Sequence, residues 1–197
     1  MHGPYDHHMA RTTRILLVSG SLRSASTNTA VLRTAGASAP PGITAELYEG
    51  LGDLPHFDPD LDRVPLPLPV EQLRASIRAA DALLLCTPEY AGALPGSFKN
   101  LLDWTIGDGQ DGSIYEKPVA WINISTLPTA AADAHASLAK VLSYTHAVVV
   151  TAACAEIPVA RDAVGGDGLV HDPAVRQRLA HALSTLADAA RGAGEAG

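Results

Sequence analysis

The sequence predicts an α/β protein with a doubly wound parallel sheet that carries helices on both faces. Five short apolar segments alternate with helical segments along the chain. These apolar segments are continuous runs rather than alternations of polar and apolar residues, which is typical of parallel strands covered on both sides. Right-handed crossovers between such strands produce a doubly wound sheet.

The five predicted strands are short runs that end in polar or turn-forming residues, as buried strands do. They cover residues 14–19, 43–48, 82–86, 118–124 and 147–153. The predicted helices cover residues 27–38, 70–80, 95–104, 130–144 and 173–191. Glycine, proline and aspartate gather at residues 49–69 and 107–112, which we expect to be loops.

The length of 197 residues suits a single domain. We expect this domain to cover residues 13–191, between flexible tails at 1–12 and 192–197. The chain is 47% hydrophobic and 18% charged, which is enough apolar material for a full core.

The charge and the apolar segments exclude several partners. The formal net charge is −7, so we expect no nucleic-acid partner and no binding to anionic membranes. The apolar runs are too short to span a bilayer, and the N-terminus lacks the apolar segment of a secretion signal. The cytoplasm is therefore the expected location.

Cysteine and histidine give no sign of a metal site. Cys86 and Cys154 both lie in apolar runs and are expected to be buried core residues. Two cysteines alone cannot ligate an iron–sulfur cluster, and they do not suggest a disulfide framework. The histidines at positions 2, 7 and 8 fall in the predicted N-terminal tail.

The loop after the first predicted strand has the composition of a phosphate site. Ligands bind doubly wound sheets at the carboxyl ends of the strands, and a helix follows this loop, so its N-terminal amides favour an anion. The loop has neither the dinucleotide nor the nucleoside-triphosphate glycine pattern, which leaves a monophosphate. The alternative is ordinary capping of the helix by Ser26 or Thr27. The candidate binding residues are Ser21, Arg23, Ser26, Thr27 and Asn28.

The loop after the third predicted strand is the second candidate site. Pro88 stiffens the exit from a buried strand, and we expect the backbone groups of residues 89–92 to be free to face a ligand. A flat heterocycle with polar edge atoms suits such a rim.

Together the two loops resemble the NADPH-dependent FMN reductase family. The phosphate-loop pattern G-S-x-R-x-x-S-x-N of that family is matched at Gly20, Ser21, Arg23, Ser26 and Asn28. Its second pattern, P-E-Y-N followed by P-G-x-L-K-N and D-W, is matched at Pro88, Glu89, Tyr90, Pro95, Gly96, Lys99, Asn100, Asp103 and Trp104. The likeness covers roughly residues 13–190.

The resemblance implies a flavodoxin-like sheet in the order 2-1-3-4-5 with bound FMN, in a homodimer or homotetramer. It implies that Ser21, Arg23, Ser26 and Asn28 hold the phosphate. The isoalloxazine would be lined by Pro88, Glu89, Tyr90 and Ala91. Residues 95–104 would serve as a scaffold or a subunit interface.

The chain departs from the family pattern in two places. Ala91 stands where the family has Asn or Gly. Residues 125–132 contain no glycine, whereas the family loop there is often S-x-G-x-x-G-G. Because glycine permits positive φ, we expect this loop to take another path. Ser125 and Thr126 either offer hydroxyls to the flavin edge or cap the following helix.

The implied function is an FMN-dependent NAD(P)H oxidoreductase that passes hydride from NADPH to bound flavin. A small acceptor would then take the electrons: flavin, a quinone, an azo compound or a metal oxyanion. No catalytic side chain is assigned, because the flavin carries the redox chemistry.

Other functions stay open from the sequence. The altered loop at residues 125–132 leaves open a flavin-binding accessory or biosynthetic protein that NADPH does not reduce. An electron carrier fits less well, because flavodoxins proper have a different phosphate loop and a stronger negative charge. A hydrolase is disfavoured, because no nucleophile-elbow pattern is present.

Overall fold

The computed structural model describes residues 11–106 and 113–195 of the chain. The loop predicted at residues 107–112 and most of the predicted N-terminal tail, including its histidines, lie outside the described residues.

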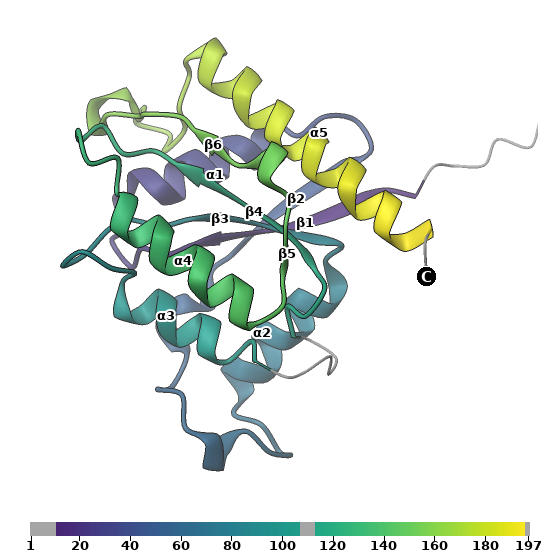
Figure 1. The fold of residues 1–197 in the computed structure, drawn as a ribbon. Coiled ribbons are helices and arrows are strands. Elements are labelled where there is room, and N and C mark those ends of the chain that lie inside the picture. The colour runs from purple at the N-terminus through teal and green to yellow at the C-terminus, as the bar shows by residue number, and fades with distance from the viewer. Residues whose placement is uncertain (1–10, 107–112, 196–197) are drawn as a thin grey trace, which may run out of the picture.

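The described residues form a parallel sheet in the order β2-β1-β3-β4-β5, which confirms the predicted flavodoxin-like fold (Figure 1). Each neighbouring pair in this order is parallel. The strands are β1 (Thr13–Ser19), β2 (Ile43–Tyr48), β3 (Ala82–Cys86), β4 (Pro118–Asn123) and β5 (Val148–Val149).

The last strand differs from the prediction of one continuous run at residues 147–153. After β5 the chain makes a 3₁₀ turn, η3 (Thr151–Ala153), and then a second short strand, β6 (Ala155–Glu156). β6 pairs with the carboxyl end of β4, so the edge of the sheet is built from two pieces. The 3₁₀ turn begins at Thr151 and includes Ala152 and Ala153, and alanine has a weak β propensity.

The helices cover the two faces of the sheet unequally (Figure 1). One face carries α1 (Thr27–Ala37) and α5 (Pro173–Glu195), and the latter extends beyond the end expected at residue 191. The other face carries α2 (Leu68–Ala79), α3 (Gly96–Asp103) and α4 (Ala132–Tyr144). The remaining 3₁₀ turns are η1 (Gly50–Asp53), η2 (Pro59–Leu61) and η4 (Arg161–Ala163).

Side chains of the central strands alternate between two buried apolar clusters. In β1, Ile15 and Leu17 belong to the cluster under α1 and α5, whereas Leu16 and Val18 belong to the cluster under α2, α3 and α4. Successive strand residues point to opposite faces, so a strand buried on both faces needs apolar residues throughout. This explains the continuous apolar runs in the sequence.

Asn100 and Trp104, which belong to the second family pattern, hold the loop around Pro55 in place. The Asn100 side chain accepts a hydrogen bond from the Phe57 amide at 2.7 Å and donates one to the Pro55 carbonyl at 2.9 Å. The fully buried Trp104 also donates to the Pro55 carbonyl, at 2.8 Å. These contacts are the ones that a scaffold role requires.

No helix in the described parts of the chain is both long enough and apolar enough to span a membrane.

Gly20 allows the ends of β1 and β3 to approach closely. A Cβ atom at this position would lie 2.3 Å from Oγ1 and 2.7 Å from Cβ of the buried Thr87. We therefore expect Gly20→Ala to lower the free energy of unfolding by about 2–3 kcal/mol through overpacking, measured by urea denaturation. Gly96→Ala is the matched control, because a Cβ there meets no atom within 4 Å. Equal denaturation midpoints for the two variants would contradict this account.

Candidate functional site

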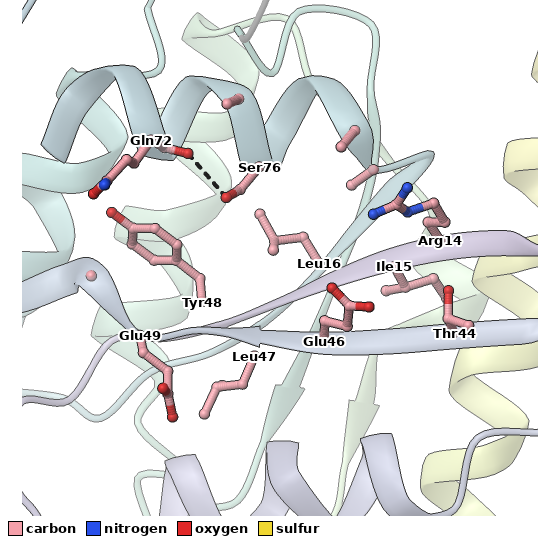
Figure 2. Close-up of a pocket in the computed structure, with 14 residues that line it drawn as sticks. Arg14, Ile15, Leu16, Thr44, Glu46, Leu47, Tyr48, Glu49, Gln72 and Ser76 are labelled. Carbon is pink, nitrogen blue, oxygen red and sulfur yellow. Dashed lines mark hydrogen bonds between the residues drawn. The ribbon is translucent and has the colours of Figure 1, made fainter. Parts of the chain in front are cut away.

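One hollow of the protein, of about 440 Å³, lies on a face of the sheet between β2 and α2 (Figure 2). Arg14 and Leu16 from the first half of β1, Tyr48 from β2 and Gln72 from α2 contribute to its walls. The hollow is therefore away from the carboxyl ends of the central strands, and neither motif loop contributes to it.

A second hollow, of about 290 Å³, lies at the carboxyl edge of the sheet, where the loops after β1, β3 and β4 meet. We call it the edge cavity. With the exception of Ala91, every residue proposed from the sequence to bind the cofactor lines it. These residues are Ser21, Arg23, Ser26, Thr27, Asn28, Pro88, Glu89, Tyr90, Ser125 and Thr126.

The loop after β1 is held by its own hydroxyl groups. The Ser26 side chain caps α1 by accepting a hydrogen bond from the Thr29 amide at 3.4 Å. The Ser21 amide donates to the Ser19 hydroxyl, and the Arg23 amide donates to the Ser21 hydroxyl, both at 3.3 Å. Ser26 therefore both caps α1 and lines the edge cavity.

Two arginine side chains from distant parts of the chain line the edge cavity. Arg23 comes from the loop after β1 and Arg161 from η4. Both are exposed, and neither side chain makes a hydrogen bond or an ion pair with another described residue. Guanidinium groups are strong donors to phosphate. The part of the cavity wall that holds Arg23 and Arg161 therefore suits an anion.

The loop after β3 is a tight turn. Tyr90 and Ala93 exchange two backbone hydrogen bonds, at 3.0 and 3.1 Å, and both central residues have positive φ, 51° at Ala91 and 69° at Gly92. This is the pattern of a type I′ turn. The expectation of free backbone groups was therefore wrong for Tyr90, whose amide and carbonyl are both used inside the turn. Its side chain, 48% exposed, remains in the cavity wall.

Glu89 links the loop after β3 to α4. Its carboxylate accepts a hydrogen bond from the Ala134 amide at 3.0 Å, in the first turn of that helix. A carboxylate at a helix N-terminus is favoured by the helix dipole. Glu89, which lines the edge cavity, thus ties the loop after β3 to the first turn of α4.

The loop after β4 has positive φ at two alanine residues. Ala130 and Ala131 have φ values of 48° and 50°, and the Asn123 side chain donates to the Ala130 carbonyl at 2.5 Å. The alternative that Ser125 or Thr126 caps α4 was wrong, because the N-cap is Ala131 and has no side-chain cap. The Ser125 hydroxyl instead accepts from the Leu127 amide at 3.3 Å.

Sequence reasoning missed part of the cavity wall. Val159, Ala160 and Arg161 follow β6, and they reach the edge cavity because β6 pairs with the carboxyl end of β4. No motif marks this segment, so only the pairing of the strands reveals it. The other lining residues that it missed are Thr87, Asn123, Ile124, Leu127 and Ala131.

The two cysteines are free and differ in burial. Cys86 is fully buried, as predicted, whereas Cys154 is only partly buried. Among the described residues, no group of three or more His, Cys, Asp or Glu side chains is placed to hold a metal ion.

Comparison with known proteins decides the family. Residues 13–162 match the model of the family described as NADPH-dependent FMN reductase. The chain belongs to this family. The match contains both motif loops, the loop after β4 and Arg161, so every residue that lines the edge cavity lies within the matched region.

Full-length relatives agree with this assignment. An NAD(P)H-dependent FMN reductase of Pseudomonas aeruginosa is 32% identical over 178 residues, which cover 90% of this chain and 95% of the relative. The solved structure of FerB from Paracoccus denitrificans, a flavoenzyme NAD(P)H:(acceptor) oxidoreductase, superposes with a TM-score of 0.77 at 30% identity. The superposition covers 91% of this chain and 98% of the FerB chain.

A quinone reductase of Escherichia coli strain K12 is 35% identical over 97 residues, 49% of this chain and 52% of the relative. Together these relatives show that this FMN reductase family member is an oxidoreductase.

The alanines at positive φ in this member of the FMN reductase family lead to a stability prediction. A left-handed conformation costs an L-residue about 1–2 kcal/mol, and glycine avoids this at a smaller entropic cost. We expect Ala91→Gly and Ala130→Gly each to raise the free energy of unfolding by about 0.5–1 kcal/mol, measured by thermal denaturation.

The control for this prediction is Ala136→Gly, at an exposed position inside α4. It should lower stability by about 1 kcal/mol, because glycine is unfavourable within a helix. A loss of stability in all three variants would show that the two loops are not strained.

Proposed function

We propose that this protein is an FMN-dependent NAD(P)H oxidoreductase and that the edge cavity holds the flavin. Bound flavin supplies the chemistry, taking hydride from NADPH and passing electrons to a small acceptor. The observation that carries the proposal is that the loops after β1, β3 and β4 meet at one cavity, whose wall also holds Arg23 and Arg161.

The lining residues fit the chemical groups of FMN. Ser21, Thr27 and Asn28 offer polar atoms beside Arg23 and Arg161, which suits a phosphate. Pro88, Tyr90 and Leu127, from the loops after β3 and β4, line the same cavity and offer apolar surface to a flat ring system.

The edge cavity is small, and two large apolar side chains in its wall are exposed. A volume of about 290 Å³ is at the small end for ligand sites, so the cavity would not wholly enclose a ligand of the size of FMN. Tyr90 and Leu127 are 48% and 66% exposed. In the proposed reaction the donor and the acceptor use this exposed side in turn.

A neighbouring hollow supports a phosphate-bearing donor. It measures about 370 Å³ and shares Arg23, Ser26, Thr27 and Arg161 with the edge cavity. Arg33 adds a third guanidinium group, which also pairs with the Glu49 carboxylate at 3.3 Å. The residues that line this hollow include no acidic side chain. Such a surface attracts the phosphates of NADPH or NADH.

For the acceptor, we propose a small molecule, with free flavin and quinones favoured by the relatives named FMN reductase and quinone reductase. Azo compounds and metal oxyanions are the other candidates. A homodimer or homotetramer stays a prediction, as does the assignment of each lining residue to a part of the flavin.

Removal of one phosphate-binding arginine should separate FMN from riboflavin. We expect Arg23→Ala to weaken FMN binding by about 10- to 100-fold, because a charge-assisted hydrogen bond is lost. Riboflavin, which has no phosphate, should lose less than about 3-fold. Titration of the flavin fluorescence measures both dissociation constants.

Arg161→Ala should behave in the same way, since Arg161 lines the same cavity. Arg78→Ala, on the exposed side of α2, is the control and should leave both affinities unchanged. Equal losses for FMN and riboflavin would contradict the phosphate role.

Rapid mixing with NADPH separates the enzyme from the alternatives. In the proposed oxidoreductase the absorbance of bound flavin should disappear after anaerobic mixing with NADPH, as followed by stopped flow. An electron carrier or accessory protein would lose its colour with dithionite and keep it with NADPH. A protein that binds no FMN at tens of micromolar flavin would contradict the proposal as a whole.

A further inference from the structure

Asn28 joins the edge cavity to the buried end of β3. It lies in the first turn of α1, lines the cavity and is only 9% exposed. Its Oδ1 atom accepts a hydrogen bond at 3.2 Å from Sγ of Cys86, 58 positions further along the chain. Cys86 is the last residue of β3 and is fully buried.

This hydrogen bond determines which way the Asn28 amide faces. An amide side chain has one acceptor atom, the oxygen, and one donor atom, the nitrogen. Because Oδ1 is turned to the thiol, Nδ2 is turned away from it, and no described residue accepts a hydrogen bond from Nδ2. Cys86 thus leaves the donor end of the amide available to a ligand.

Nδ2 also keeps access to solvent, and Asn28 lines the cavity. Among the described residues, the side-chain nitrogen and oxygen atoms that are sealed from solvent without a partner are Ser38 Oγ and His135 Nε2. Asn28 Nδ2 therefore keeps access to solvent, although its residue is nine-tenths buried. Asn28 Nδ2 is thus a hydrogen-bond donor without an acceptor among the described residues, and it lies near Ser26 and Thr27 at the N-terminus of α1.

The Cys86 thiol is protonated at neutral pH. Burial raises the pKa of Cys86, because the charged thiolate would lose its solvation. The proton that the hydrogen bond needs is therefore present at neutral pH.

We propose that Cys86 is a positioning residue for the flavin phosphate: its thiol holds the amide of Asn28 so that Nδ2 donates to a phosphate oxygen. The inference rests on the proposed binding of FMN in the edge cavity. A cysteine that only fills space beneath α1 would affect stability and leave the choice between FMN and riboflavin unchanged.

The test compares side chains at position 86 that donate with those that do not. Cys86→Ala and Cys86→Val lack a donor, with Val close to Cys in size, whereas Cys86→Ser keeps one. We expect FMN binding to weaken by about 3- to 10-fold in Ala and Val and to remain near wild type in Ser. The riboflavin affinity should change by less than about 2-fold in all three variants.

A double-mutant cycle with Asn28 tests the route of the effect. Asn28→Ala should weaken FMN binding, and Cys86→Ala should add nothing in the Asn28→Ala background, because the amide to be positioned is gone. Cys154→Ala is the matched control, since that thiol contacts the Val150 carbonyl and does not line the cavity. Denaturation midpoints of every variant are measured alongside.

The outcomes are distinct. Additive effects of the two substitutions, unchanged FMN binding in both Ala and Val, or equal losses for riboflavin would each overturn the role of Cys86. If the wild-type protein itself binds no FMN, the proposed function fails first, and that result is separate from any behaviour of the variants.

Discussion

The edge cavity depends on the parallel arrangement of β1, β3 and β4 as neighbours in one sheet. Because these strands run in the same direction, the loops that follow them leave the sheet from one edge. That arrangement is possible because both faces of the sheet are covered, so the strands are apolar throughout and polar groups gather beyond their ends. The chemistry of the protein is therefore confined to loops by the burial of its strands.

A few polar contacts hold these loops relative to one another. Glu89 bridges the loop after β3 to α4, Asn123 closes the loop after β4, and Cys86 reaches Asn28 across the buried face of the sheet. Each contact joins two separate elements or the ends of one loop. The cavity wall is thus organised before a ligand arrives, which reduces the entropy lost on binding.

Charge and strain at the cavity differ from those of the chain as a whole. The formal net charge is −7, yet Arg23 and Arg161 bring two free positive charges to one end of the cavity. Ala91, Ala130 and Ala131 hold positive φ in two of the surrounding loops, a conformation that glycine adopts at lower cost. Local backbone strain of this kind persists where the surrounding contacts enforce it, and the Asn123 bond to Ala130 is one such contact.

The sequence by itself determined the fold class, the bounds of the central strands to within one residue, and the two motif loops. These features depend on local apolar runs and on short patterns of fixed spacing. Tertiary structure decided the rest. It divided the last strand into β5 and β6, which brought Arg161 into the cavity wall, and it used the Tyr90 backbone inside a turn. It also placed Ala130 and Ala131 at positive φ, a conformation that is unfavourable for alanine. These features depend on contacts between segments far apart in the chain, such as that of Cys86 with Asn28, and no local pattern records such contacts.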